Sequence, residues 1–121
     1  MSEMKLAILA LVVLASPVAA ADNICRSPDL AARQSDAMQA YSRCGMAYGI
    51  KLAPSGSDPD DIATAAESTC GPERISLHDA STNCRNRRYA DMAVARIEKS
   101  FRQSVIATVV EARATSSQPS R

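Results

Sequence analysis

Apolar residues recur at intervals of three, four or seven positions in the first part of the chain, with polar residues between them. The members of this stripe are Leu30, Ala37, Tyr41, Cys44, Tyr48 and Leu52. Such spacing is typical of one apolar face of an α-helix. Ser27, Pro28 and Asp29 precede it and supply a capping hydroxyl, a first-turn proline and an acid at the positive end of the helix dipole. The sequence therefore predicts a helix that ends near Ala53, where the breakers Pro54-Ser55-Gly56-Ser57 begin.

A second stripe follows Asp58-Pro59-Asp60-Asp61, which repeats the same signal for a helix start. Its members are Ile62, Ala66, Thr69 or Cys70, Leu77 and Cys84. Gly71-Pro72 falls in the middle of this stripe, so we expect the helix either to kink or to be briefly interrupted there. The short connection between the first two predicted helices favours an antiparallel helical hairpin.

A third stripe occupies the last part of the chain and predicts a third helix. Its members are Ala90, Ala93 or Val94, Ile97, Phe101, Val105, Thr108 and Val109. We expect a turn at 81–83 or 84–86 before it, since one continuous helix would leave this stripe without a partner. Glu98 and Arg102 are spaced for an ion pair along the helix. The alternative is a strand at 105–110, where β-branched residues gather.

The first 20 residues predict a cleavable export signal. A uniformly apolar run from Leu6 to Leu14 follows Lys5 and ends in small residues up to Ala20, which predicts cleavage before Ala21 or Asp22. The run is shorter than the roughly 20 residues that cross a bilayer. We therefore expect a periplasmic or secreted protein that does not span the membrane after cleavage, with one domain at 22–113 and a disordered tail at 114–121.

Four cysteines in a short exported chain predict two disulfides, with three possible connectivities. If the hairpin turns near Gly56, Cys44 lies 12 residues before the turn and Cys70 lies 14 after it. Cys25 and Cys84 lie 31 before and 28 after, again at nearly equal depth. The predicted pairing is therefore nested, Cys44 with Cys70 and Cys25 with Cys84. A bridge from Cys25 to Cys44 would have to cover roughly 28 Å of intact helix, against a Cα separation below about 7 Å in disulfides.

The fold class predicted from these patterns is all-α: a small antiparallel helical hairpin braced by two nested disulfides, with a third amphipathic helix packing on it. In topology this resembles helical-hairpin proteins of the coiled-coil-helix-coiled-coil-helix type. Their paired cysteines are evenly spaced, whereas the gaps in this chain are 18 and 13 residues. The likeness concerns architecture alone and implies no activity.

Charge is distributed unevenly along the domain. Residues 22–83 contain five basic and nine acidic side chains, a net charge of −4, whereas residues 84–121 contain eight basic and three acidic ones, a net charge of +5. Either the two halves dock on each other, or the basic half contacts an anionic partner. Arg85, Arg87 and Arg88 form the densest basic cluster, directly after Cys84. They are the candidate contact with an anionic partner.

Catalytic and metal-binding chemistry has little support in the sequence. The chain contains no Cys-x-x-Cys motif, no phosphate loop and no recognisable triad, and Asp58, Asp60 and Asp61 are interpreted as helix caps. We therefore expect a structural or protein-interaction module of the envelope, inhibitor-like, immunity-type or stress-related, rather than an enzyme, with no cofactor, no metal and no nucleic-acid partner. The alternative is a metal or small-ligand carrier that uses His78, Asp79 and the methionines Met38, Met46 and Met92.

Overall fold

The computed structural model describes residues 24–117. These residues form the helices α2 (Pro28–Leu52), α3 (Pro59–Thr69), α4 (Gly71–Cys84) and α5 (Arg87–Ser116), with a short 3₁₀ turn, η1 (Ala53–Ser55), after α2. The export signal predicted for residues 1–20 lies outside the described residues.

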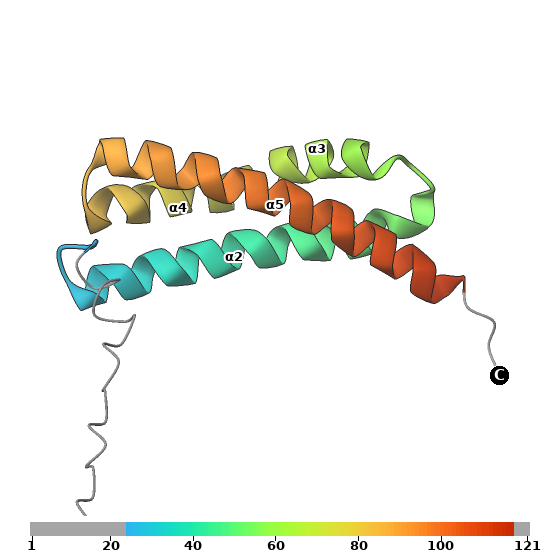
Figure 1. Ribbon diagram of the computed structural model, residues 1–121, viewed down its shortest axis with the longest axis horizontal. Helices are drawn as coiled ribbons and strands as arrows, with labels where there is room; N and C mark the ends of the chain where they lie inside the picture. Colours follow the sequence, from blue (N-terminus) through green and yellow to red (C-terminus); the bar gives the residue numbers. More distant parts are fainter. Residues whose placement is uncertain (1–23, 118–121) are drawn as a thin grey trace, which may run out of the picture.

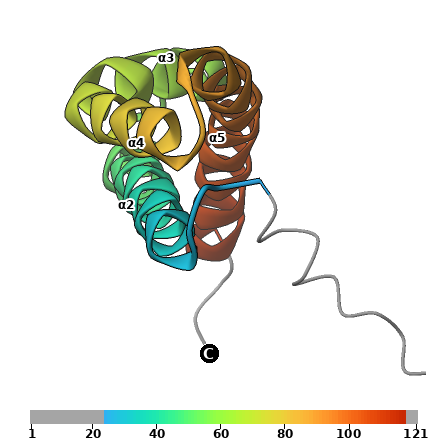
Figure 2. The ribbon, with the colours of Figure 1, turned by 90° about the vertical axis from the view of Figure 1, so that its left-hand side faces the viewer.

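The helices form an antiparallel arrangement in which α3 and α4 together return alongside α2. Figure 1 shows α2 and α5 running in the same direction, with α3 followed by α4 running back. Figure 2, an end view, shows α2, α4 and α5 arranged around a common centre. The predicted all-α class, with a hairpin and a third helix packed on it, is confirmed.

Side-chain caps fix where the helices begin. The Ser27 hydroxyl accepts a hydrogen bond from the Leu30 N–H at 3.2 Å, and an Asp58 carboxylate oxygen accepts one from the Asp60 N–H at 2.8 Å, as the sequence predicts. Asn86 caps α5 by accepting from the Tyr89 N–H at 2.8 Å. This cap confirms a turn within 84–86 and a separate third helix. The strand alternative at 105–110 is wrong, because these residues continue α5 and bury Val105 and Val109.

The second predicted helix is interrupted at Cys70, between α3 and α4. Proline disrupts a helix interior but fits a first turn, and Pro72 lies in the first turn of α4. The Cys70 N–H still donates to the Ala66 carbonyl at 2.8 Å, so α3 ends without an unpaired amide there. Cys70 itself is fully buried at the break.

A close approach of α2 and α5 forms the centre of the core. The Tyr41 and Phe101 rings are stacked with centroids 4.1 Å apart and planes 6° apart. Gly45 lies directly against this pair, since a Cβ atom at Gly45 would lie 2.3 Å from Phe101 Cε2. A Cβ at Gly49 would lie 3.4 Å from the Val105 carbonyl oxygen. That distance at Gly49 is an ordinary van der Waals contact, so it is the absence of a side chain at Gly45 that allows the two helices to pack closely.

Tyr41 is fully buried, and its hydroxyl has no hydrogen-bond partner among the described residues. Burial, followed by the charges of Glu98 and Glu67, raises the pKa of Tyr41 to about 12, and Arg74 partly opposes this. The aromatic pair therefore contains one polar atom that contributes no hydrogen bond to stability.

The C-terminal end of α5 extends beyond the predicted domain boundary. The tail predicted at 114–121 begins too early, because α5 continues through Ser116. The Arg113 guanidinium donates to the Ala53 carbonyl at 2.8 Å and to the Ser57 carbonyl at 2.6 Å, which ties this end to the turn after α2. The hydroxyls of Thr115 and Ser116 also donate to carbonyl oxygens one turn earlier in α5. Residues 118–121 lie outside the described residues.

Within residues 24–117, no helix has both the length and the apolar character needed to cross a membrane.

Candidate functional site

Both predicted disulfides are present. The outer bridge joins Cys25 to Cys84 with a Cα separation of 4.5 Å, and the inner bridge joins Cys44 to Cys70 with a Cα separation of 6.0 Å. The connectivity is nested, as the distances from the hairpin turn predict. Two disulfides are consistent with folding in an oxidising compartment.

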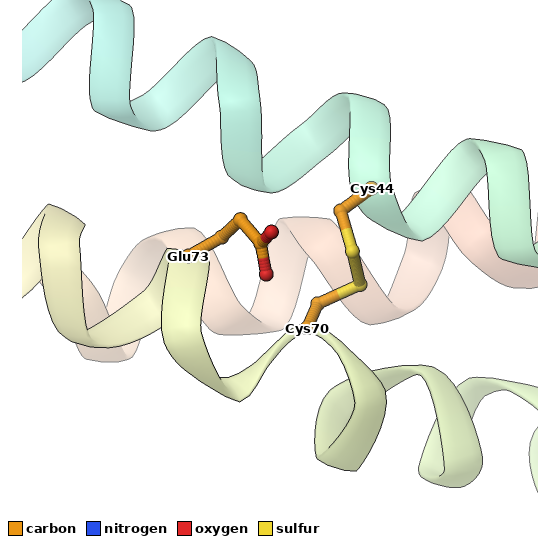
Figure 3. A group of neighbouring side chains, drawn as sticks. All are labelled: Cys44, Cys70 and Glu73. Atoms are coloured by element: carbon orange, nitrogen blue, oxygen red, sulfur yellow. A yellow bond between two sulfur atoms is a disulfide. The ribbon is translucent and has the colours of Figure 1, made fainter.

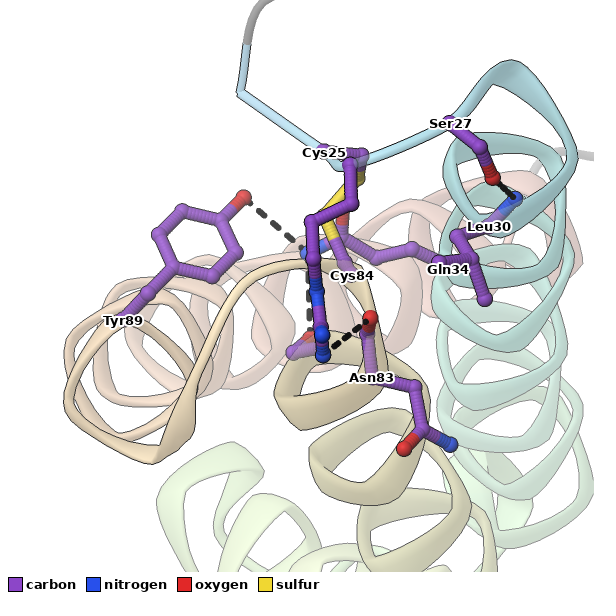
Figure 4. Close-up of a disulfide and its surroundings, with 9 residues drawn as sticks. Cys25, Ser27, Leu30, Gln34, Asn83, Cys84 and Tyr89 are labelled. Carbon is purple, nitrogen blue, oxygen red and sulfur yellow. Dashed lines mark hydrogen bonds between the residues drawn. A yellow bond between two sulfur atoms is a disulfide. The ribbon is translucent and has the colours of Figure 1, made fainter.

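A polar network surrounds the outer bridge and joins three helices (Figure 4). The Gln34 amide nitrogen on α2 donates to the Ser81 hydroxyl on α4 at 3.0 Å and to the Tyr89 hydroxyl on α5 at 3.1 Å. The Arg26 N–H donates to the Cys84 carbonyl at 2.7 Å, and its guanidinium donates to the Asn83 carbonyl at 3.1 Å. This end of the bundle is therefore held by covalent and hydrogen bonds together.

The predicted anionic-partner residues lie at this same end. Arg85 occupies the turn between α4 and α5, and Arg87 and Arg88 are the first two residues of α5. All three are exposed, and none forms an ion pair within residues 24–117. The Arg85 guanidinium lies over the Tyr89 ring, 5.9 Å from its centroid. We call these three arginines the basic end.

Arg87 and Arg88 lie where the dipole of α5 is unfavourable for a cation. Cations near a helix N-terminus oppose the macrodipole, and such interactions are worth about 0.3–1 kcal/mol each at exposed positions. The first turn of α5 contains Arg87 and Arg88 but no acid. The dipole of α5 therefore does not favour arginine at these two positions.

The two oppositely charged halves dock on each other through a different arginine. Arg102 donates to Glu67 at 2.5 Å and approaches Asp60 at 3.4 Å, and both acids belong to α3. Glu98 pairs with Arg74 of α4 at 3.4 Å. The predicted pair of Glu98 with Arg102 within α5 is therefore wrong, because each side chain reaches a neighbouring helix instead. Docking between the halves accounts for Arg102 and leaves the basic end without an ion pair among residues 24–117.

The histidine and the methionines predicted for a metal carrier lie in different parts of the domain. His78 Nε2 lies 2.7 Å from an Asp91 carboxylate oxygen, so its partner is on α5 rather than the adjacent Asp79. In the described part of the chain, His78 belongs to no group of three His, Cys, Asp or Glu donors within 4.8 Å of one another. Met38 and Met92 line a groove between α2 and α5 that His78 does not line, and Met46 is exposed on α2.

One compact group of potential ligands surrounds the inner bridge. A carboxylate oxygen of Glu73 and the sulfurs of Cys44 and Cys70 all lie within 4.8 Å of one another, and Figure 3 shows the carboxylate beside the disulfide. Because the two sulfurs are bonded to each other, neither is a thiolate able to bind a metal. The carboxylate oxygen Oε1 of Glu73 is buried without a hydrogen-bond partner among the described residues. With the bridge intact, this group is structural.

Several residues at the outer bridge carry no recognisable signal in the sequence. Gln34 is isolated within a polar stretch of the first helix, and its partners lie 47 and 55 residues away. The adjacency of Arg85, Arg87 and Arg88 to Cys84 is visible in the sequence, whereas their lack of ionic partners among the described residues is visible only in three dimensions.

Comparison of this chain with protein-family models, with curated proteins and with solved structures finds no match.

Proposed function

We propose that this protein is a small exported interaction module of the cell envelope, periplasmic or secreted, whose basic end binds an acidic partner protein. The export signal predicted for residues 1–20 and the two disulfides support an oxidising location outside the cytoplasm. The proposal includes no catalytic activity, because its basis is a surface and not a reactive group.

The single observation that carries the proposal is the unpaired charge at the basic end. Arg87 and Arg88 occupy a helix end whose dipole disfavours cations, and none of the three exposed arginines has an ionic partner within the described residues. Arginine favours planar, bidentate contacts with carboxylates. The Cys25–Cys84 bridge and the Gln34 hydrogen bonds reduce the freedom of the backbone that carries these side chains. Less ordering entropy is then lost on binding, which favours a specific protein over a diffuse charged surface.

The test is affinity capture from the native envelope fraction with the oxidised protein as bait. The test variant replaces Arg85, Arg87 and Arg88 by Gln. The control replaces three other exposed basic residues by Gln: Arg43, Lys51 and Lys99. We expect the wild type and the control to retain the same partner, and the test variant to lose it. Equal recovery by all three proteins would contradict a role for the basic end.

The number of captured partners distinguishes the kinds of interaction module. One stoichiometric acidic protein would support an inhibitor-like or immunity-type role, whereas many substoichiometric proteins would support a stress-related holdase. If the protein binds anionic vesicles and retains no protein, the partner of the basic end is a membrane surface and not an acidic protein.

The second candidate, a metal carrier, has one observation in its favour, namely the contact of His78 with Asp91 across α4 and α5. Adding copper or zinc to the oxidised protein and measuring its thermal unfolding tests this candidate. A metal-dependent rise in Tm that is lost in His78→Gln would favour the carrier. An unchanged Tm would remove it.

A further inference from the structure

An apolar groove lies between the first half of α2 and the first half of α5. Its volume is about 410 Å³. Its lining includes the apolar residues Ile24, Met38, Met92, Ala93 and Ile97 and the basic residue Arg96. Figure 1 shows α2 and α5 diverging toward their N-terminal ends. The residues that line the groove on both helices belong to this divergent part.

Three large apolar side chains of the groove remain accessible to water. Ile24, Met38 and Met92 are 40%, 38% and 59% exposed. Exposed apolar area in a concave site is typical of a ligand-binding groove, and methionine adapts its shape to different apolar ligands. An apolar ligand would remove this surface from water.

We propose that this groove binds a single-chain fatty acid, with the acyl chain along Met38, Met92 and Ile97 and the carboxylate at Arg96. Among residues 24–117, Arg96 is the only charged residue that lines the groove, and it forms no ion pair with the others. An apolar channel with one cation matches a molecule that has one anionic head and one apolar chain. This inference concerns different residues from the basic end and does not depend on the acidic protein partner.

The length of the groove limits the acyl chain that it can cover. Its walls extend from Ala31 to Met38 on α2 and from Tyr89 to Ile97 on α5. At 1.5 Å per residue, a wall of eight residues is roughly 12 Å long. A longer acyl chain would extend beyond these walls into water.

The experiment is calorimetric titration of the oxidised, signal-cleaved protein with saturated fatty acids from hexanoate to tetradecanoate, below their micelle concentrations. We expect affinity to rise by about twofold to fourfold for each added methylene, because each buried methylene contributes up to about 0.8 kcal/mol. The rise should stop near decanoate or dodecanoate, where the chain becomes longer than the groove. Acetate and decanol, which lack the chain and the charge respectively, should each bind at least about tenfold more weakly than decanoate.

Two variants test the two parts of the site. Arg96→Gln should weaken decanoate binding about tenfold or more and leave decanol binding unchanged, whereas the neighbouring exposed Lys99→Gln should leave both unchanged. Ala93→Phe should fill the groove and abolish binding of both ligands. Circular dichroism and Tm establish that each variant is folded, and Ala31→Leu provides a second groove-filling change on the other helix.

Four results would overturn the fatty-acid site: no binding of any chain, affinity that keeps rising beyond tetradecanoate, equal binding of decanoate and decanol, or binding unaffected by Ala93→Phe and Ala31→Leu. None of these results affects capture of an acidic protein through the basic end, so the two proposals can fail separately.

Discussion

Replacing Gly45 by Ala tests whether the packing of α2 on α5 is as close as the structure indicates. In most helix interiors this change is stabilising, since alanine has a higher helix propensity than glycine by about 1 kcal/mol. At Gly45 the new methyl group would lie 2.3 Å from Cε2 and 2.7 Å from Cζ of Phe101. The ring cannot move freely, because Phe101 is 3% exposed and is stacked on the fully buried Tyr41.

The expected magnitude follows from these opposing effects. Overpacking of a core costs about 1–3 kcal/mol, and disturbing a stacked aromatic pair costs about 0.5–1.5 kcal/mol more. After subtraction of the propensity gain, Gly45→Ala should lower the free energy of unfolding by about 0.5–3.5 kcal/mol. For a domain of this size, the corresponding fall in Tm is roughly 2–28 °C.

Thermal and urea unfolding of the oxidised protein, followed by circular dichroism, measure this effect. Gly71→Ala is the matched control, because a Cβ at Gly71 would have no neighbour within 4 Å and should be neutral or slightly stabilising. Phe101→Leu in the Gly45→Ala background should recover part of the lost stability, since the smaller side chain relieves the clash. If Gly45→Ala raises the Tm as much as the control does, the close approach of α2 and α5 is incorrect.

Three further changes probe other parts of the domain. Tyr41 has a pKa raised to about 12 in the folded protein, so stability should be constant below pH 10 and fall between about pH 10 and pH 12, because the unfolded state loses the proton first. In Tyr41→Phe, urea midpoints should show a smaller fall over this range and no loss of stability at pH 7. An unchanged pH profile in this variant would exclude Tyr41 as the cause. Arg102→Gln should destabilise the domain by about 1 kcal/mol through lost contacts with Glu67 and Asp60, and high salt should reduce this loss. The control Lys99→Gln should have no effect in the same urea titration. Equal effects of the two changes would mean that Arg102 contributes only through its general charge. The double variant Cys44→Ala/Cys70→Ala should lower the free energy of unfolding by about 3 kcal/mol, while its circular dichroism spectrum remains helical. An unchanged urea midpoint would show that the inner bridge contributes nothing to stability.

The helix starts and the disulfide connectivity could be predicted because both depend on features close together in the sequence or symmetric about one turn. Ser27 and Asp58 cap the residues that follow them, so their effect is local. The nested pairing needs only the position of the turn near Gly56 and equal distances from it. Gly71-Pro72 marked the weak point of the second helix for the same local reason, although the sequence left open whether the helix would kink or stop.

The side-chain partners across the bundle could not be predicted in the same way. Arg102 has a suitable acid in its own helix at Glu98, yet it binds Glu67 of α3, 35 residues away. Likewise, His78 binds Asp91 although Asp79 is adjacent to it in the sequence. Both choices depend on how α5 is rotated and displaced along the other helices, which a stripe of apolar positions does not specify. The groove between α2 and α5 depends on the same rotation, so its lining was equally invisible in the sequence.

Nested disulfide bridges hold the two facing helical segments together. Proteolytic peptide mapping of the unreduced, exported protein by mass spectrometry measures this connectivity directly. We expect one linked pair of peptides containing Cys25 and Cys84 and another containing Cys44 and Cys70. A linkage between Cys25 and Cys44, or four free thiols in the exported protein, would contradict it.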